Sequence, residues 1–201
     1  MGNLARMELV VREGQGAQLS IKSYAWQPTE TWRPDTQVLL AHSPVGVLVA
    51  FEVHDQFLLG RYQGYDDPVY QDSCVEFFFN PLPGRLEGYY NIEVNVSGGV
   101  KFNYQRSRGV DRRTMPEGLL RDLRVDPGVI IDPEHGEPMV WRVSYVVPWE
   151  AVSSEDSRDW RANFYKCCED NSHPHFGSWS PIETESPDFH RPEFFGTLRF
   201  E

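Results

Sequence analysis

The chain has 201 residues, a formal net charge of −11 and a 13% share of aromatic residues. This length is enough for one domain with a substantial buried core. The acidic balance argues against nucleic acid or an anionic membrane as the main partner. The N-terminus has no basic segment followed by an apolar one, and there is no apolar run of about 18 residues. The sequence therefore predicts neither a signal peptide nor a transmembrane helix.

Short apolar runs separated by turn residues follow one another along the chain. Residues 1–34 are mixed and polar, and they predict an N-terminal extension that packs on a domain formed by residues 35–201. The predicted strands cover residues 19–25, 37–42, 47–53, 74–80, 90–96, 100–104, 139–147, 160–168 and 194–200. Helix is expected only as a turn near Leu119 and a short piece over 150–154. This pattern predicts an all-β single domain, an antiparallel β-sandwich of the jelly-roll or immunoglobulin-like kind, with a β-barrel as the competing architecture.

A central hairpin carries the residues of greatest interest. Val75, Phe77 and Phe79 share one face of its first strand, and the second strand alternates in the same way after a turn-rich loop over 81–88. The apolar face should pack into the core. The opposite face carries carboxylates and amides, namely those of Glu76, Asn91, Glu93 and Asn95. This polar face, with Tyr70 just ahead of it, is therefore the predicted functional surface.

Five segments in a fixed order carry a resemblance to a known family. They are YQDSCVEFFF at 70–79, YNIEVN at 90–95, WRANFYK at 160–166, SWSP at 178–181 and FHRPEFFGTLRF at 189–200. In this order they resemble carbohydrate-binding module family 9 and the related DOMON-like domains. The resemblance covers roughly residues 35–201 and implies a two-sheet jelly-roll sandwich without catalytic machinery.

The resemblance also implies positions for a sugar site. In the members attached to xylanases, two aromatic rings clamp the terminal sugar of a polysaccharide. The matching positions here are Tyr70 and Phe189, where those members have Trp. The family's glutamate falls on Glu76, and an arginine of those members falls on Glu93. The implied function is non-catalytic binding of a poly- or oligosaccharide, including its chain ends, in association with a glycoside hydrolase.

The chemistry of sugars agrees with this set of residues. A flat aromatic ring covers the apolar face of a sugar, and carboxylates and amides bind its hydroxyls. The predicted binding residues are Tyr70 and Phe189 for stacking, with Glu76, Asn91, Glu93, Asn95 and Arg191 for hydrogen bonds. If the protein binds a polysaccharide, an extracellular or periplasmic location is expected; otherwise the compartment stays open.

Two alternative functions remain open. The domain could be a scaffold that binds no ligand, in which Tyr70 covers a sheet edge and Phe189 anchors a loop. It could also be a glycoside hydrolase, because Glu76 and Glu93 on neighbouring strands have the form of an acid/base pair. If the domain only binds sugar, no residue is catalytic. Turnover of aryl glycosides that is lost in Glu76→Gln would support the hydrolase alternative.

Metal sites are considered from two groups of residues. Four acidic residues cluster in loops and make a structural calcium ion plausible, although their spacing is not that of an EF-hand. They are Asp55, Asp66, Asp67 and Asp72. Cys167 and Cys168 with His173 and His175 suggest zinc, but adjacent residues of a strand point to opposite faces. We therefore interpret these two cysteines, like Cys74, as buried thiols.

Overall fold

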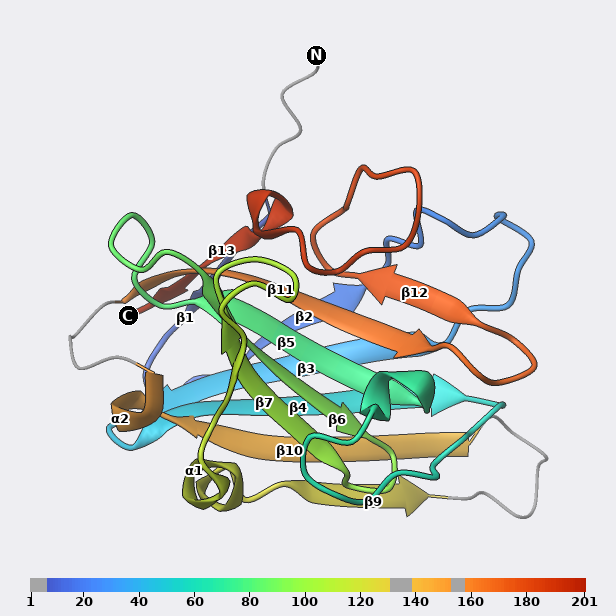
Figure 1. Cartoon of the computed structure of the whole chain (residues 1–201), viewed down its shortest axis with the longest axis horizontal. Coiled ribbons are helices and arrows are strands. Elements are labelled where there is room, and N and C mark those ends of the chain that lie inside the picture. Colours follow the sequence, from blue (N-terminus) through green and yellow to red (C-terminus); the bar gives the residue numbers. More distant parts are fainter. Residues whose placement is uncertain (1–6, 131–138, 153–157) are drawn as a thin grey trace.

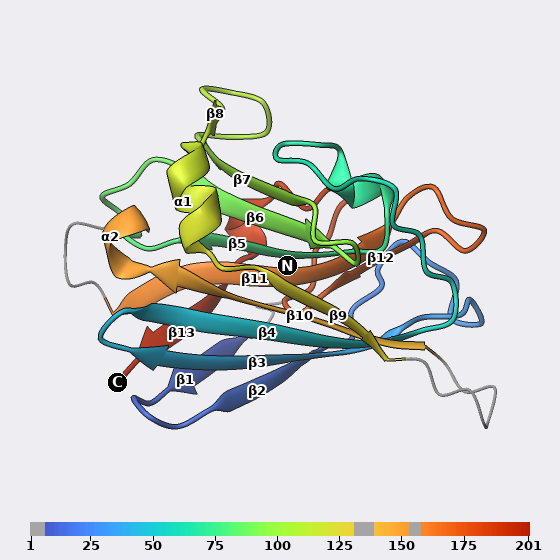
Figure 2. The ribbon, with the colours of Figure 1, turned by 90° about the horizontal axis from the view of Figure 1, so that it is seen from below.

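Two mainly antiparallel β-sheets lie face to face in the computed structural model, which describes residues 7–130, 139–152 and 158–201 (Figure 1). The larger sheet contains, in spatial order, β1 (Glu8–Val11), β13 (Gly196–Phe200), β11 (Asp159–Cys168), β5 (Cys74–Asn80), β6 (Tyr89–Asn95), β7 (Val100–Gln105) and β8 (Arg113–Thr114), with β12 (His175–Ser178) also paired to β11. The smaller sheet contains β2 (Ala17–Ile21), β3 (Asp35–Ser43), β4 (Gly46–Asp55), β10 (Met139–Pro148) and β9 (Asp126–Ile130). Figure 2 shows the two layers nearly edge on, with β5, β6 and β7 above β3 and β4.

Helical structure is limited to short pieces between the strands. These are η1 (Val69–Gln71), α1 (Glu117–Asp122), α2 (Trp149–Val152) and η2 (Pro192–Phe194). In the part of the chain that the structure describes, no helix has the length and apolar character that crossing a membrane requires.

The predicted β-sandwich is confirmed, as is the central hairpin of β5 and β6. The strands β1, β8, β9 and β12 were not expected from the sequence. Residues 1–34, expected as an extension that packs on the domain, supply strands to both sheets: β1 pairs with β13 in parallel, and β2 pairs with β3. Both strands, β1 and β2, are therefore part of the sandwich and not an extension packed on it.

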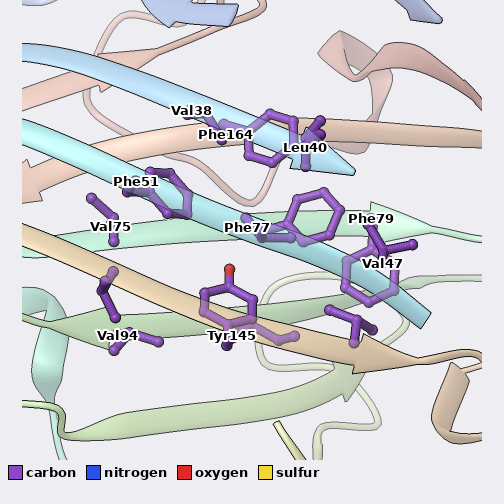
Figure 3. Close-up of a cluster of buried hydrophobic side chains, with 14 of the residues drawn as sticks. Val38, Leu40, Val47, Phe51, Val75, Phe77, Phe79, Val94, Tyr145 and Phe164 are labelled. Atoms are coloured by element: carbon purple, nitrogen blue, oxygen red, sulfur yellow. The ribbon is translucent and has the colours of Figure 1, made fainter. Parts of the chain in front are cut away.

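The core between the sheets follows the alternation in the sequence. Val47, Phe51 and Tyr145 of the smaller sheet face Phe77 and Phe164 of the larger sheet (Figure 3). The rings of Phe77 and Phe164 stack with centroids 4.6 Å apart and planes 4° apart. Each fully buried side chain of this size contributes about 1.5–3 kcal/mol to stability.

A buried ion pair interrupts this apolar core at one end. Lys166 lies opposite Val75 in the β5–β11 register, and its side chain is fully buried. Its Nζ lies 3.3 Å from Asp55 Oδ2 and 2.7 Å from His175 Nε2. Because ammonium only donates, Nε2 of His175 accepts, and Nδ1 donates to the His173 carbonyl oxygen at 2.8 Å. Burial, with Lys166 nearby, lowers the pKa of His175 to about 3, so this ring is neutral.

The outer face of the larger sheet is also partly covered. A second cluster of buried side chains lies there, including Phe78, Tyr89, Tyr165, Phe189 and Phe195. Segment 182–195 supplies the covering residues from the end of the chain. Beside this cluster the sheet is left hollow, which is where the polar residues of β5, β6 and β7 gather.

Candidate functional site

A cavity of about 410 Å³ lies on the outer face of the larger sheet. Its floor comes from β5, β6, β7 and β11, and its walls come from η1 and the segments 106–112 and 187–190. The two wall segments are joined by an ion pair, in which Arg108 Nη1 lies 3.2 Å from Asp188 Oδ1. The volume falls in the range of about 300–1,000 Å³ that small-molecule sites occupy.

Strand register gathers the polar side chains of the floor. Glu76 of β5 lies opposite Glu93 of β6, and Glu93 lies opposite Lys101 of β7. Asn91 lies opposite Asn103 in the same β6–β7 pair. Since these residues are spaced by two along their strands, they all point to the outer face.

Hydrogen bonds connect most of these side chains in one network. Asn91 Nδ2 donates to Glu93 Oε1 at 2.8 Å, and Gln105 Nε2 donates to Asn91 Oδ1 at 2.9 Å. The same Nε2 lies 3.1 Å from His190 Nδ1, and the Tyr89 hydroxyl lies 2.9 Å from that nitrogen. Burial, with Arg108 nearby, lowers the pKa of His190 to about 4, which keeps the ring neutral and able to accept. The floor is thus held in one arrangement before any ligand arrives.

Two buried polar atoms of the floor have no partner among the described residues. They are Glu93 Oε2, an acceptor, and Asn103 Nδ2, a donor. The side-chain oxygen of Asn103, Oδ1, accepts from Arg112 Nη2 at 3.3 Å, which fixes the orientation of the amide. A buried polar group without a partner costs about 1–3 kcal/mol. Both residues line the cavity, so ligand hydroxyl groups placed there can donate to Glu93 or accept from Asn103.

Aromatic rings contribute apolar surface to the same cavity. Tyr70, in η1, is half-buried, and the Lys101 ammonium lies 5.6 Å from its ring centroid. Phe189 is 9% exposed and stacks on Tyr165 with centroids 4.1 Å apart. Phe176 lines the cavity as well, with its centroid 6.2 Å from that of Phe189. The cavity therefore combines flat apolar rings with a polar floor.

Both carboxyl groups of the floor are held in surroundings that disfavour charge. Burial raises the pKa of Glu76 well above its usual range. Burial also raises the pKa of Glu93 to about 7, although Lys101 and the Asn91 hydrogen bond oppose this shift. A neutral carboxyl group can donate as well as accept a hydrogen bond.

One known protein family covers nearly the whole chain. The sequence model of carbohydrate-binding family 9 matches residues 6–200. This chain belongs to carbohydrate-binding family 9. The match includes β1 and β2, so the strands from residues 1–34 lie within the span of the family. No protein with a curated function matches the sequence.

Three solved structures share the fold of this family 9 domain. A candidate carbohydrate-binding protein from Bacteroides uniformis ATCC 8492 is 28% identical, with a TM-score of 0.80 over 98% of this chain and 100% of that chain. A family 9 module from Caldicellulosiruptor kristjanssonii in complex with cellotriose is 13% identical, with a TM-score of 0.60 over 97% and 94%. A family 9 module from the same organism in complex with glucose is 12% identical, with a TM-score of 0.57 over 97% and 96%.

Two of the seven residues predicted for the site lie away from the cavity of this family 9 domain. Asn95 is fully buried at the end of β6, where its Nδ2 donates to Asp72 Oδ2 at 2.9 Å and its Oδ1 accepts from the amide of Gly99 at 2.8 Å. Arg191 pairs with Glu193 at 2.7 Å and lines a separate surface hollow. The other five predicted residues line the cavity, namely Tyr70, Glu76, Asn91, Glu93 and Phe189.

Several residues that line the cavity of the family 9 domain were not predicted from the sequence. Lys101, Asn103 and Gln105 alternate along β7 with Val100 and Phe102, so their spacing carried the same signal as the polar residues of β6. His190 and the two cavity arginines, Arg108 and Arg112, lie in irregular segments with no periodic signal.

The four loop acids expected to hold calcium in this family 9 domain do not converge on one point. Asp55 pairs with Lys166, and Asp66 pairs with Arg112. Asp67 accepts from the amide of Gly64 at 2.8 Å, and Asp72 pairs with Arg61 at 2.9 Å. Among the described residues, these acids therefore form no common ligand set.

Proposed function

We propose that the cavity binds a saccharide without catalysis. The observation that carries the proposal is the pair of buried, unpartnered atoms, Glu93 Oε2 and Asn103 Nδ2, in a cavity with aromatic walls. An acceptor and a donor in one cavity suit the hydroxyl groups of a sugar, which both donate and accept. The rings of Tyr70 and Phe189 would cover the apolar face of the same sugar.

The known complexes of other family members support this class of ligand. Two structural neighbours were solved with cellotriose and with glucose. Neutral glucose-based oligosaccharides are therefore the first ligands to test here. Their lack of charge also suits a chain with a net charge of −11, because no attraction between charges is needed for encounter.

The expected affinity is modest. Stacking of one ring face on a sugar contributes about 2–3 kcal/mol, at about 25 cal/mol for each Å² of apolar surface. A few hydrogen bonds add to this, and the loss of ligand freedom opposes it. We expect dissociation constants of about micromolar to millimolar.

Isothermal titration calorimetry with glucose and cellotriose, preceded by a glycan array, tests the proposal. We expect Tyr70→Ala to weaken binding at least tenfold, because it removes one ring of the cavity. Arg191→Ala is the matched control, because Arg191 was predicted for the site but lies outside the cavity. A folded protein that binds no glycan of any class would contradict the proposal and favour a scaffold role.

A further inference from the structure

Two cysteines and a glutamate meet at the floor of the cavity. Cys74 of β5 lies opposite Cys167 of β11, and Glu76 follows two residues after Cys74, so all three side chains are on the outer face of the sheet. One ligand atom from each residue lies within 4.8 Å of the other two. Cys167 Sγ lies 3.1 Å from Glu76 Oε1. Among the described residues, no other set of three or more His, Cys, Asp and Glu side chains meets this criterion.

These separations suit the edges of a metal tetrahedron. Zinc binds thiolate sulfur at about 2.3 Å and carboxylate oxygen at about 2.0–2.2 Å. In a tetrahedral site, those bond lengths place two sulfurs about 3.8 Å apart and a sulfur about 3.5 Å from an oxygen. Cys167 Sγ and Glu76 Oε1, 3.1 Å apart, are near the length of such a sulfur–oxygen edge, and Cys74 Sγ lies within 4.8 Å of Cys167 Sγ and of a Glu76 carboxyl oxygen.

The charge balance of the cluster favours a cation as well. Glu76 is 3% exposed, and no basic side chain among the described residues lies within 4.0 Å of its carboxyl oxygens. Lys166 is next to Cys167 in sequence, but it points to the opposite side of β11 and pairs with Asp55. Two thiolates and a carboxylate buried together carry negative charge that no basic side chain nearby balances, and a divalent cation bound between them would balance it.

The cluster is accessible from one side. Glu76 and Cys167 line the cavity, so an ion bound between the three residues would have one coordination position facing the cavity. Two sulfurs and one oxygen select soft or borderline divalent cations over calcium and magnesium.

We propose that Cys74, Cys167 and Glu76 bind one soft divalent cation of the zinc class at the floor of the cavity. The fourth position is open to water or to a ligand hydroxyl. Binding displaces the thiol protons into solvent, because the thiolate is the form that binds metal. This proposal does not depend on sugar binding, and it can hold even if no sugar binds.

Titration of the reduced chain of 201 residues with Cd²⁺ tests this site. Thiolate bound to cadmium gives a charge-transfer band in the ultraviolet, so the band reports direct sulfur coordination. We expect saturation at one Cd²⁺ per chain. Cys74→Ser and Cys167→Ser should each lower the intensity and weaken binding at least tenfold. Glu76→Gln should weaken binding but keep the intensity at saturation, because both thiolates remain.

Cys168→Ser is the matched control. Cys168 follows Cys167 on β11 but points to the other side, where its Sγ lies 3.9 Å from the Ser73 hydroxyl. It should leave both the band and the affinity unchanged. A band that survives Cys74→Ser and disappears in Cys168→Ser would overturn the assignment, as would saturating Cd²⁺ without any band.

A measurement on the unsubstituted chain covers the case in which a cysteine variant does not fold. Zn²⁺ should raise the melting temperature of the reduced protein, and a chelator should reverse the shift. Zn²⁺ should also protect Cys74 and Cys167 from alkylation while Cys168 reacts at an unchanged rate, as read by mass spectrometry. Under conditions where all three thiols are alkylated at a measurable rate without Zn²⁺, unchanged rates in its presence would contradict the proposal.

Discussion

The ring of Phe189 lies parallel to the ring of Tyr165, with centroids 4.1 Å apart and planes 9° apart. The Tyr165 hydroxyl also donates to the carbonyl oxygen of Phe189 at 3.1 Å. A residue from a loop near the end of the chain is thus held on β11 by both its ring and its backbone. This contact sets the position of the Phe189 wall relative to the polar floor.

Replacement of Phe189 by leucine tests whether sugar binding needs the flat aromatic ring or only a buried apolar side chain at this position. Phe189→Leu keeps an apolar side chain but removes the stack on Tyr165, which should lower the free energy of unfolding by about 1 kcal/mol. Affinity for cellotriose should fall about tenfold, because a branched side chain covers a sugar face poorly. Calorimetry and chemical denaturation measure the two effects. An unchanged affinity would place the sugar away from this ring.

Asn103 and Asn95 should respond in opposite ways to alanine substitution. Asn103→Ala removes the unpartnered donor of the cavity floor, and we expect a fivefold to tenfold loss of sugar affinity with little change in stability. Asn95→Ala removes hydrogen bonds to Asp72 and to the turn at Gly99, and should lower the free energy of unfolding by about 3 kcal/mol. Affinity measured on the folded fraction of Asn95→Ala should stay near that of the unsubstituted protein. The reverse pattern would contradict the site geometry.

The buried ion pair of Lys166 should be costly to break from one side. Lys166→Met leaves Asp55 buried without a cation, and we expect a loss of about 3–5 kcal/mol in the free energy of unfolding. Adding Asp55→Asn to this variant should restore part of the loss, because no unpaired charge then remains. The exposed Lys22 provides the control, and Lys22→Met should change stability by less than about 0.5 kcal/mol. Denaturant unfolding of the four proteins measures these differences.

His190 should make stability depend on pH between about 6.5 and 4. Its pKa is lowered from 6.5 to about 4 in the folded protein by burial and by Arg108, against the opposing effect of Asp188. At this position the unfolded chain therefore binds more protons in this range, so the contribution of His190 to the free energy of unfolding falls as the pH falls. Glu93, whose pKa is raised to about 7, contributes in the opposite direction. For a shift of this size the contribution of His190 is about 3 kcal/mol.

A histidine variant isolates this contribution. His190→Asn keeps an acceptor near Gln105 but cannot be protonated, so its free energy of unfolding relative to that of the unsubstituted protein should rise by about 3 kcal/mol as the pH falls from 6.5 to 4. His175 should still contribute in the same direction, because its pKa is also lowered, to about 3. His54, with a side chain 42% exposed, is the control, and His54→Gln should keep the full slope. A slope that is the same in His190→Asn would exclude this histidine as its source.

The alternation of apolar and polar residues predicted much of this structure. It assigned Val75, Phe77 and Phe79 to the core, and it assigned Glu76 and Glu93 to the opposite face, where the structure places them. A strand has a side-chain period of two residues, so a short stretch of sequence is enough to assign its two faces. The same rule applied to β7 would have found Asn103.

Alternation along one strand could not predict which polar residues share the cavity. Asn95 has the same period as Asn91, yet the turn after β6 and the carboxylate of Asp72 hold it inside the fold.

Likewise, Phe189 meets the cavity only because β11 and β5 are neighbours in the sheet and the segment near the end of the chain packs across them. The sequence by itself determined the two faces of each strong strand, because that information is local. The tertiary structure decided the composition of the cavity, because strand order and loop packing bring together residues that are far apart along the chain.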